Sequence, residues 1–112
     1  MYRMETYSRP KIIAFDYDDT ISSAPLTFLE VMLQFEKIGW QCVVVTYRQP
    51  DCSPEDLDFL REKGYKVYFT GQIGKEAFML AEGVSVDIWV DDSPQTVIQS
   101  YNAKHGFFYT PM

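Results

Sequence analysis

Long apolar segments are missing from the sequence, because no run approaches the roughly 18 residues that a transmembrane helix requires. The first residues, MYRMETYSRPK, carry basic side chains but no apolar segment, so we expect no signal peptide. Only two cysteines are present, Cys42 and Cys52, with no CxxC pair and a single histidine, which argues against a zinc site. We expect both thiols to be free in a reducing, cytoplasmic compartment and no membrane partner.

Positive charge is also scarce, with 10 Lys and Arg against 16 Asp and Glu and a net charge of −6. The absence of a basic stripe argues against a general nucleic-acid binder. A bound metal would still create local positive potential, so nucleic-acid ends stay open as substrates. Linkers, repeats and low-complexity stretches are missing as well. We therefore expect one domain over residues 1–112, with residues 1–10 as an N-terminal extension.

Strand-like and helix-like runs alternate along the rest of the chain. The sequence predicts strands at 12–16, 41–46, 66–69, 86–91 and 107–109. It predicts helices at 25–39, from Ser53-Pro54 to Gly64, at 75–82, and from Ser93-Pro94 towards Gly106, where Ser-Pro pairs start helices and glycines end them. In the first helix, four apolar residues recur near one face: Leu29, Met32, Phe35 and Ile38. This alternation predicts an α/β fold with a doubly wound, Rossmann-like parallel sheet of five strands.

The stretch IIAFDYDDTI, residues 12–21, places carboxylates directly after a buried strand. Three aspartates follow the apolar run: Asp16, Asp18 and Asp19. In doubly wound sheets, ligands bind beyond the carboxyl ends of the strands. That rule selects Asp16, Thr46 and Asp91, which end the first, second and fourth predicted strands. We expect these three residues to meet at one site.

Two acidic clusters reach this edge of the sheet, Asp16 with Asp18 and Asp91 with Asp92. Four neighbouring carboxylates repel one another unless some are protonated or a divalent cation lies among them. Oxygen ligands with few neutral donors favour a hard ion, and Mg²⁺ before Ca²⁺ or Mn²⁺. The sequence therefore predicts Mg²⁺ as the cofactor.

Groups that would receive an anion accompany the carboxylates. Thr46 offers a hydroxyl, Lys75 opens a predicted helix, and Thr20 and the amides after Asp18 add donors. A metal, a lysine, hydroxyls and oriented amides together are typical of a phosphoryl pocket. In such a pocket one carboxylate can act as nucleophile, and a second carboxylate, two residues on, can act as general acid.

These motifs occur in an order similar to that found in a known family. D-x-D-x-T after an apolar strand, a strand-end Thr, a downstream Lys and then apolar-DD resembles the haloacid dehalogenase (HAD) superfamily of phosphohydrolases. The resemblance covers residues 11–110 and implies a HAD-like fold. Asp19 stands where many members have glycine. True dehalogenases of the family lack the aspartate that matches Asp18, so the resemblance disfavours dehalogenation.

The resemblance implies a role for each carboxylate. Asp16 matches the nucleophile that forms an aspartyl-phosphate and also binds Mg²⁺. Asp18 matches the acid/base residue, with its backbone carbonyl on the metal. Asp91 matches the direct metal ligand, and Asp92 is expected to hold metal-bound water.

The resemblance also implies how the phosphate is held. Thr46 matches the phosphate-binding hydroxyl, and Lys75 matches the cation that bridges nucleophile and phosphoryl group. VVVTYRQP resembles the T-x-R-P-like second motif of some small members, which places Arg48, and Tyr47 beside it, among the expected substrate contacts together with Thr20.

The usual cap domain of the family has no room in this chain. Only four residues separate Thr20 from Pro25, and a helix and a strand use the stretch between Tyr47 and Gly74. An open site of this kind admits the end of a large substrate, or a neighbouring subunit of an oligomer covers it. The expected small, capless enzyme is a Mg²⁺-dependent phosphomonoester phosphatase that acts on a nucleotide, a sugar phosphate or a similar small phosphate.

Other interpretations stay open at this point. A capless phosphatase of the same kind acts instead on a nucleic-acid terminal phosphate or a phosphoprotein. A silent module binds phosphate or metal without catalysis, although every expected catalytic side chain is present. A receiver domain has similar length and acidity, but it places its lysine after the last strand, whereas Lys75 precedes Asp91 and Asp92. Asp-rich turns can also serve only to solubilise strand ends.

Overall fold

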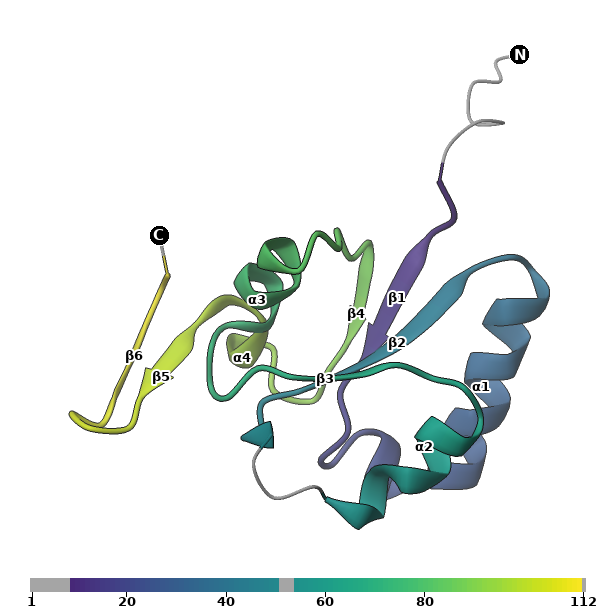
Figure 1. Cartoon of the computed structure of the whole chain (residues 1–112), viewed down its shortest axis with the longest axis horizontal. Helices are drawn as coiled ribbons and strands as arrows, with labels where there is room; N and C mark the ends of the chain where they lie inside the picture. Colours follow the sequence, from purple (N-terminus) through teal and green to yellow (C-terminus); the bar gives the residue numbers. More distant parts are fainter. Residues whose placement is uncertain (1–8, 51–53, 112) are drawn as a thin grey trace.

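Four parallel strands form the central sheet of the computed structural model, which describes residues 9–50 and 54–111 (Figure 1). They are β1 (Ile12–Phe15), β2 (Gln41–Thr46), β3 (Val67–Phe69) and β4 (Ile88–Val90). Their order in space is β3-β2-β1-β4, so β1 pairs with both β2 and β4. The predicted α/β fold with a parallel sheet is confirmed, with four strands in place of five.

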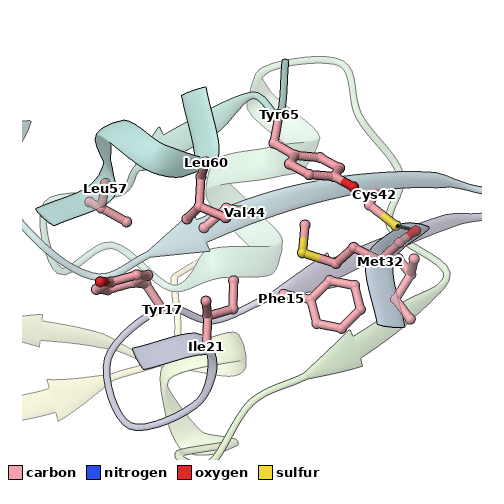
Figure 2. Close-up of a cluster of buried hydrophobic side chains, with 10 residues drawn as sticks. Phe15, Tyr17, Ile21, Met32, Cys42, Val44, Leu57, Leu60 and Tyr65 are labelled. Carbon is pink, nitrogen blue, oxygen red and sulfur yellow. Dashed lines mark hydrogen bonds between the residues drawn. The ribbon is translucent and has the colours of Figure 1, made fainter. Parts of the chain in front are cut away.

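Side chains of β1 alternate between the two faces of the sheet, and helices cover both faces. Ile13 and Phe15 belong to the larger core cluster, in which Met32 and Leu60 are fully buried (Figure 2). Ala14 belongs to a second, smaller cluster. The helices that supply side chains to the two clusters are α1 (Pro25–Lys37) and α2 (Asp58–Glu62) on one side and α3 (Lys75–Ala81) on the other. Burial of both faces explains why β1 reads as an apolar run.

The predicted inner face of α1 is confirmed except at its last residue. Met32 is fully buried, and Leu29 and Phe35 pack partly buried against the larger cluster. Ile38 is instead 65% exposed. The helix ends at Lys37, and Gly39 with a φ of 88° turns the chain away, so the helical periodicity does not extend to Ile38.

The fourth predicted helix and the fifth predicted strand are both corrected by the structure. The helix expected to run towards Gly106 is only α4 (Gln95–Ile98). The chain then forms β5 (Ser100–Asn102), which pairs antiparallel with β6 (Phe107–Tyr109) outside the main sheet. Four residues join β5 to β6, whereas a parallel crossover needs about a dozen, so the chain can return only as a hairpin.

The second predicted helix begins later than its Ser-Pro signal suggests. Ser53 and Cys52 lie outside the described residues. After Pro54 the chain forms the 3-10 helix η4 (Glu55–Leu57) and then α2, and Gly64 follows with a φ of 91°. The predicted glycine stop is thus confirmed. The third helix, α3, matches its prediction to within one residue.

Cys42 is buried and free, as predicted for this thiol. Burial raises its pKa to about 11, which keeps the sulfur in the unreactive thiol form. Among the helices of residues 9–50 and 54–111, none has the length and apolar character needed to cross a membrane.

Candidate active site

The carboxyl ends of the strands open into a pocket of about 180 Å³. It lies where β1 and β4 run into their loops, as the rule for doubly wound sheets predicts. Nine residues line it: Asp16, Asp18, Asp19, Tyr47, Lys75, Asp91, Asp92, Ser93 and Thr96. The pocket therefore brings together all four aspartates predicted to hold a metal and the predicted lysine.

Lys75 occupies the centre of the charged cluster. Its side chain is 1% exposed, and its Nζ donates to Asp16 Oδ1 at 2.8 Å and to Asp91 Oδ2 at 2.5 Å. The two carboxylates are also nearly buried, with side-chain exposures of 8% and 3%. One buried cation therefore holds the ends of β1 and β4 together, which compensates two charges that could not be buried alone.

The backbone before α3 places this lysine. A Cβ atom on Gly74 would lie 2.9 Å from the carbonyl oxygen of Ile98, so only glycine allows α3 and α4 to approach so closely. The Gly74 N–H donates to Ser100 Oγ at 2.8 Å, and both partners are buried. The first residue of α3 is thereby held against the hairpin base, and its long side chain extends to the strand ends.

Thr20 links the loop after β1 to the loop after β4. Its hydroxyl lies 3.1 Å from Asp16 Oδ2 and 3.3 Å from Asp92 Oδ1. It also accepts the Asp92 N–H at 3.3 Å. Asp91 is oriented in addition by the Ser93 N–H, which donates to Asp91 Oδ1 at 2.9 Å. Thr20 was predicted to contact substrate; here it orients two acidic side chains, and its substrate contact stays a prediction.

The loop between β1 and α1 contains a tight turn and the 3-10 helix η2 (Ile21–Ser23). Asp19 has a φ of 63°, a left-handed conformation that suits glycine and that aspartate tolerates better than most residues. Its N–H donates to Ser22 Oγ at 2.8 Å, which stabilises the turn. The turn thus holds Asp19 in a conformation that glycine adopts more readily.

Three carboxylates have the spacing of a metal site. Asp16, Asp91 and Asp92 each offer one oxygen, and these oxygens lie within 4.8 Å of one another. Such an all-oxygen donor set could hold a hard divalent cation, and the choice of Mg²⁺ stays a prediction. The carboxylate of Asp18 is not part of this set. Its predicted contact uses the backbone carbonyl and stays a prediction.

Asp16 experiences the electrostatic cost of this arrangement. The pKa of Asp16 is raised to about 6, and burial is the largest cause. Lys75 opposes this increase, whereas Asp91 and Asp92 add to it. A cation beside Asp16 would favour the ionised form that a nucleophile requires.

This pKa predicts how stability depends on pH in the absence of metal. Between about pH 4 and 6 the folded protein retains a proton on Asp16 that the unfolded chain has released. The free energy of unfolding should therefore fall as the pH rises through this window, by at most roughly 3 kcal/mol from Asp16. Urea denaturation in EDTA at several pH values measures the slope. Asp16→Asn is the control, and the same slope in both proteins would contradict the prediction.

Arg48, just after β2, contacts two carboxylates at the rim of the pocket. It donates to Asp18 from Nε at 2.9 Å and from Nη2 at 2.6 Å. It donates to Asp56 from Nη1 at 2.9 Å and from Nη2 at 2.8 Å. These bonds raise the pKa of Arg48 and lower that of Asp56. The predicted contact of Arg48 with substrate stays a prediction.

The other two residues predicted to bind substrate differ in position. Tyr47 lines the pocket, and its hydroxyl donates to the carbonyl oxygen of Gln99 at 2.7 Å. Thr46 is fully buried and is not among the described residues that line the pocket. Its hydroxyl accepts the Arg48 N–H at 3.4 Å, a long contact. The phosphate-binding role predicted for Thr46 is therefore not tested by its present contacts.

Sequence reasoning missed several polar residues near the site. Ser93 and Thr96 line the pocket. Asp56 is connected to the site by its hydrogen bonds with Arg48. Thr70 follows β3 and is 4% exposed, and its Oγ1 is the one buried side-chain N or O atom in residues 9–50 and 54–111 without a hydrogen-bond partner. The rule that selected the other strand-end residues would have found Thr70. Asp56 carries no local signal, because its role depends on a contact through space.

No family model, curated protein or solved structure matches this chain. Membership of the HAD superfamily therefore stays a prediction from motifs. The chemistry of the site rests on its own side chains and their distances. Among them, the group of Asp16, Lys75, Asp91 and Asp92 is the most specific feature.

Proposed function

We propose that the protein is a Mg²⁺-dependent phosphomonoester phosphatase of the HAD type that acts through an aspartyl-phosphate on Asp16. The observation that carries this proposal is the convergence of Asp16, Lys75, Asp91 and Asp92 in one pocket at the strand ends. A buried carboxylate with a cation beside it and two further carboxylates in reach is arranged for both metal binding and nucleophilic attack.

In the proposed reaction, Asp16 attacks the phosphorus and the ester oxygen leaves. Asp18, at the rim, donates a proton to that oxygen and then accepts one from the water that hydrolyses the aspartyl-phosphate. Lys75 keeps Asp16 oriented and offers positive charge to the phosphoryl oxygens. When bound between Asp16, Asp91 and Asp92, Mg²⁺ would supply further positive charge to those oxygens.

The size of the pocket bears on the substrate. At about 180 Å³ it is smaller than typical small-molecule pockets of roughly 300–1,000 Å³. A phosphoryl group and the metal would fill most of it, and the leaving group would lie outside. A nucleotide, a sugar phosphate or a similar small phosphate is the first substrate class we propose. The phosphorylated end of a macromolecule is the second, because the same open rim would accept it.

The metal requirement gives the test of this function. Hydrolysis of nitrophenyl phosphate should need Mg²⁺ and should stop when EDTA is added, because the carboxylates then lose their cation. Mg²⁺ should also raise the melting temperature, since it binds the folded protein only; the stabilisation is about 2.7 kcal/mol at roughly 100 times Kd. Activity assays and thermal melts with and without Mg²⁺ measure both effects.

A matched control separates the site from general effects of the ion. Asp92→Asn removes one of the three carboxylates that would hold the ion, directly or through water, and should weaken the thermal shift. Asp58→Asn changes an exposed aspartate on α2 that pairs with Arg61 among the described residues, and it should leave the shift intact. Full hydrolysis in EDTA would remove the metal from the proposed mechanism.

A further inference from the structure

Asp18 is held by an arginine that is itself held by a second carboxylate. Arg48 forms two hydrogen bonds with Asp18 and two with Asp56, all between 2.6 and 2.9 Å. The three side chains come from three separate segments: the loop after β1, the loop after β2, and η4. A loop aspartate that is half exposed therefore has a defined partner in place of free rotation.

The contacts of Arg48 leave little of it for a substrate. A guanidinium has five N–H donors in a fixed plane, and the bonds to Asp18 and Asp56 use four of them. Two carboxylates also outweigh its single positive charge, so the trio has a net negative charge. In this arrangement Arg48 is better suited to orient Asp18 than to bind a phosphate.

Asp56 is in turn anchored to the loop that carries Asp18. The Tyr17 hydroxyl donates to the backbone carbonyl of Asp56 at 3.0 Å. The guanidinium of Arg48 lies over the Tyr17 ring, 5.3 Å from its centroid. Tyr17 is 6% exposed and belongs to the larger core cluster. The position of Asp56 relative to Asp18 is therefore set by the packed core and not by the exposed ion pairs alone.

We propose that Asp56 is a positioning residue that acts through Arg48 to hold the Asp18 carboxylate in place for proton transfer. The inference rests on the proposed phosphatase function, in which Asp18 protonates the leaving oxygen. Without Asp56, Arg48 bonds only Asp18 among these two carboxylates. The arginine can then follow Asp18 into other rotamers. A general acid that is displaced by about 1 Å can lose on the order of 10²-fold in rate.

The inference predicts a loss that depends on the leaving group. Phenolate is a poor leaving group and needs the proton from Asp18, whereas nitrophenolate leaves readily without it. Asp56→Asn should therefore lower kcat for phenyl phosphate by about 10-fold or more and lower it much less for nitrophenyl phosphate. KM should change little for both esters, because Asp56 does not line the pocket among the described residues.

Two further variants separate positioning from a structural role. In the double variant Asp18→Asn/Asp56→Asn, the second change should add less than about twofold to the effect of Asp18→Asn, because Asp56 acts only through Asp18. Asp58→Asn, on the neighbouring helix α2, removes a similar exposed ion pair and should keep wild-type kinetics on both esters. Circular dichroism and melting temperature verify that each variant is folded.

Equal losses on the two esters, additive losses in the double variant, or a faster Asp56→Asn enzyme would overturn the positioning role while the phosphatase function stands. A raised KM in Arg48→Ala with unchanged kcat would show that Arg48 binds substrate, and it would also overturn the inference. Wild-type protein that hydrolyses neither ester with Mg²⁺ would overturn the proposed function, and the inference with it.

Discussion

Asp16→Asn is expected to abolish turnover, with a loss on the order of 10⁴-fold or more. An amide cannot attack phosphorus to form an aspartyl-phosphate, and no other described carboxylate lies both against Lys75 and at the end of β1. The side chain is nearly isosteric and keeps an oxygen for Lys75, so the fold should survive. Steady-state assays with nitrophenyl phosphate measure the loss, and acid quenching with radiolabelled substrate detects the phosphoenzyme in the wild type only.

Asp18→Asn provides the comparison for this prediction. It keeps the nucleophile but removes the acid, so the loss should be smaller, ~10²–10⁴-fold. The loss should also shrink with the better leaving group, which Asp16→Asn would not show. An Asp16→Asn enzyme with near wild-type activity would mean that another group is the nucleophile.

Lys75→Met is expected to cause the largest loss of stability of any single substitution in the site, about 3–5 kcal/mol in EDTA. The side chain is 1% exposed and bonds both Asp16 and Asp91, so its removal leaves two buried carboxylates facing each other without a cation. Methionine retains most of the aliphatic volume, which separates the electrostatic effect from a cavity. Urea denaturation measures the free energy of unfolding.

Mg²⁺ tests the origin of that loss. In Lys75→Met the ion should recover more free energy of unfolding than it adds to the wild type, because it replaces the only buried cation between the two strand ends in the described residues. Lys63→Met, at an exposed residue just after α2, serves as the control and should stay within about 0.5 kcal/mol of wild type. A loss below about 1 kcal/mol in Lys75→Met would show that the buried pair contributes little.

Lys75 belongs to the fold and to the candidate site at once. The lysine joins β1 to β4, and the same contacts would hold Asp16 ready for attack. Proteins often keep a costly buried charge cluster where function requires it, since apolar residues of similar volume would be as stable or more stable. The raised pKa of Asp16 is the measurable sign of that cost.

Local patterns in the sequence were enough to predict most of the framework. Apolar runs identified all four strands of the sheet, because a strand buried on both faces has no polar alternation. The rule for strand ends selected Asp16, Thr46 and Asp91, and Asp16 and Asp91 do line one pocket, whereas Thr46 is buried beside it. These predictions succeeded because strand order and handedness in parallel sheets allow few alternatives.

Chain length between elements limited what the patterns could predict near the C-terminus. Phe107–Tyr109 has the composition of a strand, and that was predicted correctly. The strand that pairs with Phe107–Tyr109 was not predicted. Periodicity indicates that a segment is extended, but it carries no information on which strand lies beside it. The short turn after β5 selected an antiparallel hairpin in place of a fifth parallel strand.

Contacts of the charged side chains outside the motifs came from the tertiary structure alone. The sequence shows Arg48 beside a phosphate-binding motif, but it does not show that Asp18 and Asp56 use four of the donors of Arg48. Thr46 likewise ends a strand as predicted, yet it is fully buried. Hydrophobic periodicity is a local property that the sequence contains directly. A hydrogen-bond partner depends on distances between segments, and those exist only after the chain has packed.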